Sequence, residues 1–253
     1  MAEPPLAGCG VAVTRAAHQA GELCRALELA GASTLRFPAI AIEACTPRAP
    51  PTGAFDWVIY TSSNAVEHAG ALRRLDAQVA AIGPATATAL AAHGVAPTVV
   101  APGDGTESLL AMLRPRLDTG QRALLVTGHD GRDLLSRALE AAGVAVHSAA
   151  VYRRHRPAGD AGPLLEARRR GRLHAVTITS NAALSNLHAL LGPQARALLE
   201  QLQLVVASKR AVRLARELGI VRAPLVASDA SAAALVAALA AWWPAERRTE
   251  HGR

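Results

Sequence analysis

The chain has 253 residues, of which 51% are hydrophobic and 19% are charged. This composition excludes an intrinsically disordered chain, and at ~150 residues per domain the length predicts one large domain or two modest ones. No apolar run reaches the ~20 residues of a membrane span, and the N-terminus lacks the pattern of a secretory signal, so we expect a cytoplasmic protein.

The net charge of +7 comes almost wholly from arginine, because Lys209 is the only lysine. A guanidinium binds carboxylates and phosphates through two parallel hydrogen bonds. The charge therefore suits a polyanionic small molecule and a nucleic acid equally well. A solvated helix end accounts for the cluster of Arg168, Arg169, Arg170 and Arg172 without any partner.

Metal and disulfide chemistry lack their usual spacings. Cys9, Cys24 and Cys45 are an odd number without a C-x-x-C pair, which argues against a disulfide framework or a zinc knuckle. Cys24 lies among the apolar positions of an expected helix and should belong to the core. The nine histidines contain no H-E-x-x-H. We expect no metal.

Short β-type runs alternate with helical patterns from one end of the chain to the other. The expected strands, each with the helix that follows it, are residues 11–13 and 18–30, 56–60 and from 63, 79–82 and 84–93, 123–126 and 132–142, 175–178 and 182–191, and 204–206 and 209–218. Four helical stretches end at a glycine, which accepts a left-handed backbone at little cost: Gly31, Gly94, Gly143 and Gly219. The alternation predicts a parallel α/β architecture.

Nearly the whole chain can be read as two copies of one pattern. Tyr60–Ala65 (YTSSNA) returns as Ile178–Ala183 (ITSNAA), and Ile82–Gly94 aligns with Ala207–Gly219. This duplication predicts two similar Rossmann- or flavodoxin-like parallel-sheet domains of about five strands each, joined by a two-stranded β linker. The expected boundaries are 1–37 with 156–243 for domain 1, 44–148 for domain 2, 38–43 and 149–155 for the linker strands, and 244–253 for a polar, frayed tail.

The turns that follow the expected strands are rich in small hydroxyl residues. Ligands of open parallel sheets bind at the carboxyl ends of the strands, where helix N-termini present free N–H groups. Ser, Thr and Asn are also the usual helix caps whatever the function, so capping alone would explain any single turn. No G-x-G-x-x-G follows a strand, and neither a P-loop nor a G-x-S-x-G elbow occurs. The residues alone thus indicate a two-lobed, anion-binding α/β protein.

Several segments, in the same order along the chain, resemble the uroporphyrinogen-III synthase family. They are Val13–Arg15 with His18–Gln19, Phe37–Pro38, Phe55–Trp57, the repeated Thr-Ser turns, Val79–Ala87 (VAAIGPATA), Gly131–Leu135 (GRDLL) and Val151–Arg153 (VYR), spanning roughly residues 10–241. The resemblance implies a cofactor-free cyclase of tetrapyrrole biosynthesis. Such an enzyme takes hydroxymethylbilane, a linear tetrapyrrole rich in carboxylates, removes water and closes the ring with the last pyrrole inverted.

The resemblance also implies how the reaction runs and which residues serve it. Departure of the hydroxyl gives an azafulvene cation, the terminal pyrrole attacks through its substituted carbon, and a spiro-pyrrolenine breaks and recloses. Tyr152 matches a cleft-facing tyrosine that would donate a proton to the leaving hydroxyl; packing within the linker is the competing interpretation. The implied substrate-binding residues are Thr61, Ser62, Ser63, Asn64, Gly83, Pro84, Ala85, Thr86, Thr179, Ser180, Asn181, Ser208, Lys209 and Arg210, with Arg15, Gly128 and Arg132.

One position departs from the family pattern. Thr86 matches a substrate-facing threonine, but its counterpart in the second copy is Ala211, in the segment Ser208–Ala211. The expected hydroxyl is missing there. Lys209 or Arg210 would supply charge in its place.

Two other functions remain open on the sequence. A non-catalytic, two-lobed cytoplasmic module that binds an anion or a tetrapyrrole would share the architecture. A nucleic-acid-binding role would rest on the basic segment 153–156, yet the few aromatic residues are not interleaved with the arginines as a stacking platform requires. We expect a monomer that binds hydroxymethylbilane, contacts hydroxymethylbilane synthase transiently, and binds neither nucleic acid nor membrane.

Overall fold

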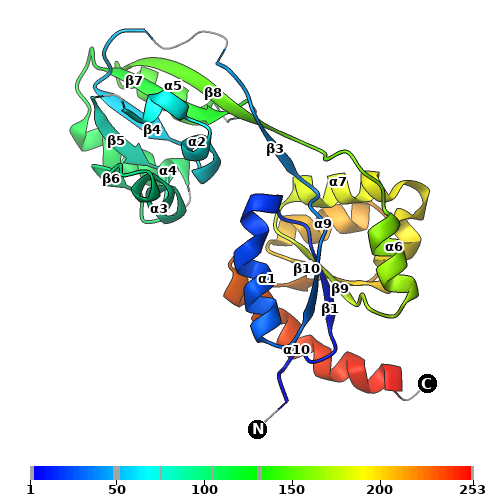
Figure 1. The fold of residues 1–253 in the computed structure, drawn as a ribbon. Coiled ribbons are helices and arrows are strands. Elements are labelled where there is room, and N and C mark those ends of the chain that lie inside the picture. Colours follow the sequence, from blue (N-terminus) through cyan, green and yellow to red (C-terminus); the bar gives the residue numbers. More distant parts are fainter. Residues whose placement is uncertain are drawn as a thin grey trace. The chain divides into compact units, whose positions relative to one another are not determined.

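The computed structural model describes residues 3–47, 52–74, 76–103, 105–129, 131 and 133–251. The chain divides into two compact units: unit 1 comprises Met1–Ala41 and Arg156–Arg253, and unit 2 comprises Ile42–His155. Each unit has its own sheet with helices packed against it (Figure 1). All strand pairs whose register is described are parallel. The predicted α/β class is therefore confirmed, while the duplication itself stays a prediction.

Unit 1 contains a five-stranded sheet in the order β11-β10-β9-β1-β2. Its strands are β1 (Gly10–Val13), β2 (Ser33–Arg36), β9 (Ala175–Ile178), β10 (Gln203–Val206) and β11 (Leu225–Val226). Every residue of β1, β9 and β10 is buried, as expected of central parallel strands covered on both faces.

Alternate residues of these strands enter two separate cores. Ala12, Val176 and Leu204 pack with α6 (Gly162–Arg169), α7 (Asn181–Leu191), α8 (Ala195–Gln201) and α9 (Lys209–Glu217). Val11 and Val205 pack on the other face with α1 (Ala20–Leu29) and α10 (Ala232–His251). Cys24, in α1, is fully buried in this second core, as predicted. Short 3-10 turns, η1 (Ala17–Gln19) and η4 (Gly192–Gln194), precede α1 and α8.

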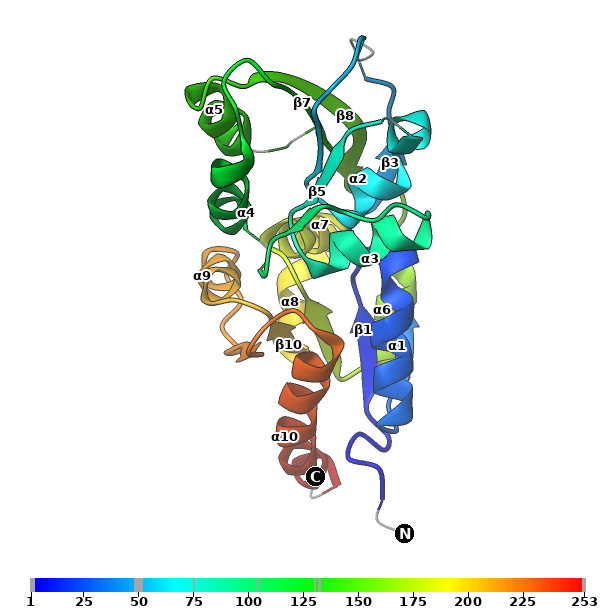
Figure 2. The ribbon, with the colours of Figure 1, turned by 90° about the vertical axis from the view of Figure 1, so that its left-hand side faces the viewer.

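Unit 2 contains a six-stranded sheet in the order β3-β8-β7-β4-β5-β6. Its strands are β3 (Ala41–Ala44), β4 (Trp57–Tyr60), β5 (Gln78–Ala81), β6 (Val99–Val100), β7 (Arg122–Gly128) and β8 (Ala145–His155). On one face lie α2 (Ser63–Glu67) and α3 (Pro84–Ala92), and on the other lie α4 (Thr106–Leu113) and α5 (Leu134–Ala141) (Figure 2). Two 3-10 turns, η2 (Gly70–Arg74) and η3 (Arg114–Arg116), complete the unit. The strand β3 overlaps the expected linker strand 38–43, and in the structure it lies beside β8 at the edge of this sheet, so the sheet has six strands where about five were expected.

The predicted helix ends have the expected backbone. Gly31, Gly94, Gly143 and Gly219 have φ values of 96°, 74°, 81° and 78°. Left-handed backbone of this kind is costly for any residue with a β-carbon. The four glycines therefore stop their helices as the sequence indicates.

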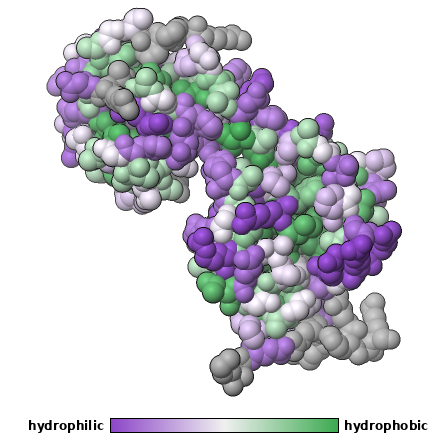
Figure 3. All heavy atoms as spheres, in the orientation of Figure 1, coloured by the Kyte–Doolittle hydropathy of each residue, from purple (hydrophilic) through white to green (hydrophobic). Residues whose placement is uncertain are grey.

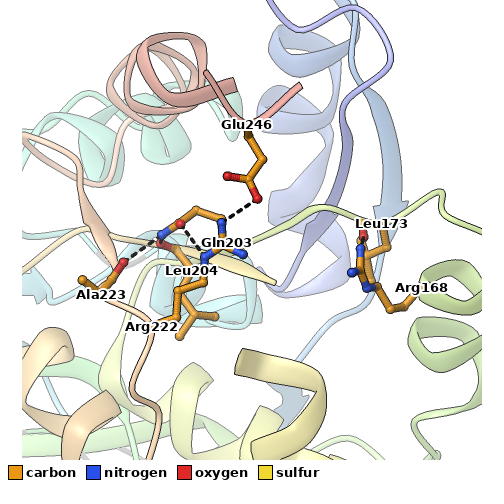
Figure 4. Close-up of polar contacts among 7 residues, drawn as sticks. All are labelled: Arg168, Leu173, Gln203, Leu204, Arg222, Ala223 and Glu246. Carbon is orange, nitrogen blue, oxygen red and sulfur yellow. Dashed lines mark hydrogen bonds and ion pairs between the residues drawn. The ribbon is translucent and has the colours of Figure 1, made fainter. Parts of the chain in front are cut away.

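The C-terminus differs from the expected frayed tail, because α10 continues through Pro244 to His251. Trp243 is buried and its indole N–H donates to the Ala7 carbonyl at 2.9 Å. Beyond the proline, Glu246 accepts a hydrogen bond from Arg222 at 2.8 Å. Arg222 in turn donates to Gln203 at 2.9 Å, and the Gln203 amide donates to two backbone carbonyls (Figure 4). These contacts offset the hydrogen bond that a proline removes from a helix.

The surface is mainly polar. Figure 3 shows hydrophilic residues across the visible face of each unit, with smaller hydrophobic areas among these residues. Among the described residues, the large hydrophobic side chains that are exposed are Leu29, Leu134, Val221 and Val226; isolated residues of this kind are ordinary. Within the same part of the chain, no helix is both long and apolar enough to cross a membrane.

Candidate functional site

A pocket of about 220 Å³ lies in unit 2, where its strands end. Thr61 follows β4, Ile82 follows β5, and Gly128 ends β7. The described residues of the lining are Thr61, Ile82, Thr106, Thr127, Gly128, His129, Gly131, Leu135, Tyr152 and Arg154. The carboxyl ends of parallel strands are where open α/β sheets bind their ligands, so this pocket is the candidate site.

Two threonine hydroxyls meet at its floor. Tyr60 of β4 pairs with Val126 of β7, and the next residue on each strand is therefore a neighbour across the sheet. Thr61 Oγ1 lies 3.0 Å from Thr127 Oγ1 and 3.3 Å from the Val126 carbonyl oxygen. A hydroxyl has one proton and two lone pairs. When Thr61 donates its proton to Thr127, the hydroxyl proton of Thr127 is therefore available to a ligand.

Tyr152 is the central polar side chain of the pocket. Only 3% of it is exposed, yet its hydroxyl has two polar neighbours. Ser62 Oγ lies 3.0 Å from the Tyr152 hydroxyl oxygen, and an Arg154 guanidinium nitrogen donates to that oxygen at 3.0 Å. The Arg154 Cζ also lies 5.5 Å from the centre of the phenol ring, within the range of a cation–π contact.

Gly128 makes room for this ring. The register between β7 and β8 shifts at Thr127 and Gly128, so that Gly128 pairs with Tyr152. A β-carbon at position 128 would lie 2.7 Å from the phenol Cζ, much closer than the ~3.5–4.0 Å of ordinary carbon contacts. The absence of a side chain at Gly128 is therefore what lets the phenol lie against the end of β7.

Helix caps account for three of the predicted serines. Ser62 Oγ accepts from the Ala65 N–H at 3.0 Å, Ser180 Oγ from the Ala183 N–H at 3.1 Å, and Ser208 Oγ from the Ala211 N–H at 3.3 Å. Each occupies the N-cap of its helix. A capping oxygen keeps its own proton, so capping leaves each hydroxyl free to donate elsewhere.

The other predicted residues of unit 2 are not among the described residues of the pocket lining. Gly83 caps α3 with extended backbone, and Pro84 is the first residue of that helix, followed by Ala85. Thr86 is 3% exposed and Asn64 is 5% exposed, so both are largely closed to solvent. Ser63 is half-buried at the start of α2. Arg132 lies outside the described residues.

The remaining predicted residues belong to unit 1 and follow its strands. Thr179, Ser180 and Asn181 come after β9, while Ser208, Lys209 and Arg210 come after β10. Both Lys209 and Arg210 are exposed. The structure thus places each predicted turn at the carboxyl end of a strand in its own unit, while the contribution of these residues to substrate binding stays a prediction.

Arg15 follows β1, and its guanidinium donates to the Ala230 carbonyl. Burial lowers the pKa of Arg15, while the Glu22 carboxylate acts in the opposite direction. In the neighbouring loop, hydrogen bonds from Ser231 hold the pKa of Asp229 below its usual value. Arg15 is therefore tied to the β11–α10 loop of unit 1.

The chain's other tyrosine differs from Tyr152. Tyr60 donates its hydroxyl proton to the Leu72 carbonyl at 3.1 Å. Burial raises its pKa to about 12, with the charge of Arg73 acting in the opposite direction. Because its proton is already bound to a backbone oxygen, Tyr60 is a structural residue.

Sequence reasoning missed seven residues of the lining. These are Ile82, Thr106, Thr127, His129, Gly131, Leu135 and Arg154. Thr127 and His129 lie in a turn that directly follows an expected strand, which was a usable signal. Arg154 lies two residues after Tyr152, and side chains two apart on a strand share a face. Leu135 ends the segment Gly131–Leu135 that resembles the family, whereas nothing local singles out Thr106; both residues belong to helices.

The comparisons with known proteins agree with this architecture. The sequence model of the family described as uroporphyrinogen-III synthase HemD matches residues 21–237. A uroporphyrinogen-III synthase from Synechococcus elongatus is 32% identical over 210 residues, which cover 76% of this chain and 78% of the relative.

Solved structures show the same fold. A mutant uroporphyrinogen III synthase from Thermus thermophilus has a TM-score of 0.55 at 22% identity, covering 95% of this chain and 99% of that one. The uroporphyrinogen-III synthetase of Helicobacter pylori has a TM-score of 0.61 at 16% identity, covering 90% and 97%. With the family model matching most of its length, this chain belongs to the uroporphyrinogen-III synthase family.

Proposed function

We propose that this protein is a uroporphyrinogen-III synthase that cyclises hydroxymethylbilane, with loss of water and inversion of the last pyrrole, in tetrapyrrole biosynthesis. Membership of the family supports the activity. The observation that carries the chemistry is Tyr152, a buried phenol that lines a polar pocket at the carboxyl ends of the strands. Among the described residues of the lining, no other side chain combines burial with an ionisable proton on oxygen.

The proposed reaction starts with a proton from Tyr152. The phenolic O–H bond breaks as its proton moves to the leaving hydroxyl, and the carbon–oxygen bond breaks with both electrons on oxygen. Water leaves, so an azafulvene cation and a phenolate remain. A positioned acid of this kind contributes roughly 100-fold or more to a rate.

The pyrroles supply the nucleophile for the later steps. The terminal pyrrole attacks the cation through its substituted carbon, and the spiro intermediate breaks and recloses on the free carbon of the same ring. The proton that this carbon loses as the pyrrole regains aromaticity returns to the phenolate. The net reaction releases one water, and the protein ends with Tyr152 protonated.

The protein's main task is then to hold a flexible polyanion in one shape. In the pocket, the hydroxyls of Thr61 and Thr127 are donors suited to carboxylates. We assign the same role to the turns of unit 1, with Lys209 or Arg210 in place of the hydroxyl that Ala211 lacks. Charge-removing variants at both positions should weaken substrate binding, and unchanged affinity would remove them from the site.

Freshly generated hydroxymethylbilane tests the activity. Spontaneous closure gives the uninverted type I isomer, so chromatographic separation of the isomers distinguishes enzymic from spontaneous product. Enrichment of type III by the wild-type chain supports the proposal. A wild-type chain that binds the bilane but yields type I alone would be a binding module instead.

Tyr152→Phe tests the acid, because it keeps the ring and removes the proton. We expect type III formation to fall by roughly 100-fold. Turnover at the parent rate would assign Tyr152 to packing alone.

The proposal includes a cytoplasmic monomer that contacts hydroxymethylbilane synthase transiently. The net charge of +7 opposes self-association at low ionic strength. Sedimentation of the purified chain, alone and with the synthase, tests both statements. A stable dimer would contradict the first, and an unchanged sedimentation coefficient in the mixture would contradict the second.

A further inference from the structure

We propose that Arg154 is a positioning residue for Tyr152: together with Ser62 it donates to the phenol oxygen, so that the phenolic proton is directed to the ligand. The inference rests on the proposed function for its catalytic consequence. It concerns a contact that the structure contains, and this contact can be tested without turnover.

The numbers of protons and lone pairs limit the hydrogen bonds that Tyr152, Ser62 and Arg154 can form together. A phenol oxygen accepts two hydrogen bonds and donates one, whereas a guanidinium only donates. Arg154 donates to the Tyr152 oxygen at 3.0 Å and so occupies one of its lone pairs. Ser62 Oγ, 3.0 Å from the same oxygen, already accepts the Ala65 N–H.

Either Tyr152 or Ser62 can be the donor in the hydrogen bond between them, and only one of these two arrangements leaves the phenolic proton available to a ligand. If Tyr152 donates to Ser62, the serine holds two accepted hydrogen bonds and the phenolic proton is not available to a ligand. If Ser62 donates, Tyr152 accepts from both Ser62 and Arg154, and its own proton points elsewhere. Because this phenol also lines the pocket, the second arrangement presents a proton to the bound substrate.

The strand explains why Arg154, and not its neighbour, has this role. Side chains alternate between the faces of a strand, so Tyr152 and Arg154 of β8 share a face and Arg153 takes the other. Arg153 forms an ion pair with Glu43 at 2.8 Å. The two arginines are adjacent and both exposed, but only Arg154 lines the pocket.

Arg154 also carries the right charge for the reaction. When the proton leaves, negative charge develops on the phenol oxygen beside the guanidinium. Donors fixed in advance at the position of a developing charge are an effective form of catalytic stabilisation. Tyr60 differs, since its hydroxyl donates its proton to the Leu72 carbonyl.

Fluorine NMR of the protein labelled with 3-fluorotyrosine tests the contact, because the chain has only two tyrosines. Tyr152→Phe assigns the signals. Arg154→Met should shift the Tyr152 signal by more than its linewidth and leave the Tyr60 signal in place. Arg153→Met is the matched control, because it removes the same charge from the other face of β8. An unmoved Tyr152 signal in Arg154→Met, or an equal shift in Arg153→Met, overturns the proposal.

Kinetics of single and double variants test the consequence. Arg154→Met should lower kcat for type III formation about tenfold or more, with Arg153→Met near the parent rate. In the Tyr152→Phe background, Arg154→Met should have little further effect on kcat, because the oxygen it acts through is gone.

Equal losses in both backgrounds, or a rise in KM with kcat unchanged, would mean that Arg154 binds a substrate carboxylate directly, and would overturn the proposal. A wild-type chain without type III activity would refute the proposed function, while the fluorine experiment would still decide the Arg154 contact.

Discussion

Replacing Gly128 with alanine inserts one methyl group between the end of β7 and the ring of Tyr152. The new β-carbon would lie 2.7 Å from Cζ and 3.0 Å from both Cε2 and the hydroxyl oxygen of Tyr152. To restore an ordinary contact distance, the ring must retreat by about 1 Å. That movement breaks the geometry with Ser62 and Arg154, each of which is 3.0 Å from the phenol oxygen.

The cost in stability follows from two opposing effects. Overpacking a well-packed site costs about 1–3 kcal/mol. A glycine-to-alanine change lowers the entropy of the unfolded chain and returns about 0.4–1 kcal/mol. We therefore expect the free energy of unfolding to fall by about 1–2 kcal/mol, and type III turnover to fall with the misplacement of the phenol.

Urea unfolding followed by circular dichroism measures the first effect, and the isomer assay measures the second. Gly103→Ala is the control, because an added β-carbon there meets no atom within 4 Å. Gly128→Ala combined with Tyr152→Leu should recover stability without recovering turnover, since the smaller side chain relieves the contact. Parent stability and parent turnover in Gly128→Ala would refute the idea that this glycine exists to seat the ring.

Three further predictions follow from contacts elsewhere. Ser62→Ala should lower the free energy of unfolding by about 1 kcal/mol through loss of the helix cap, and it should also reduce turnover. Ser180→Ala removes a cap of similar geometry and should lower the free energy of unfolding by a similar amount in urea titrations. Burial raises the pKa of Tyr60 in the folded state from 10.0 to about 12, so the unfolded chain releases the phenolic proton first. The stability that this phenol contributes is therefore present below pH 10 and is lost as the pH rises toward 12. Tyr60→Phe should flatten this decline in the free energy of unfolding between pH 9 and 11. Glu246→Gln removes the charge that pairs with Arg222 and should speed hydrogen exchange in the last turns of α10, while unchanged exchange would show that other contacts hold this helix end.

The order of elements was predictable because it depends on local patterns. Buried central strands such as β1 and β4 appear as continuous apolar runs, and the helices after β1, β5, β7 and β10 end at glycines with positive φ. The turns after the strands were also identifiable, because parallel sheets gather them at one edge. Thr61 and Gly128 were found in this way, and both line the pocket.

The C-terminus shows where local patterns mislead. A proline followed by charged residues indicates a helix end, yet α10 continues to His251. The hydrogen bond of Trp243 to Ala7 and the ion pair of Glu246 with Arg222 join residues far apart in the sequence. The local pattern around Pro244 includes neither Ala7 nor Arg222, so it gives no sign of these contacts.

The amino-acid order by itself determined the α/β class and the hydroxyl-rich turns, since each depends on residue type and on spacing along a few neighbouring positions, and its resemblance to the family singled out Tyr152. The tertiary structure decided what surrounds that tyrosine: the register shift that opposes it to Gly128, the serine cap beside its hydroxyl and the lining brought in by α4 and α5. These depend on how strands slide past one another and on where helices cross the sheet. The positions of strands and helices relative to one another are set by the packing of the whole unit, so no short segment of the chain predicts them.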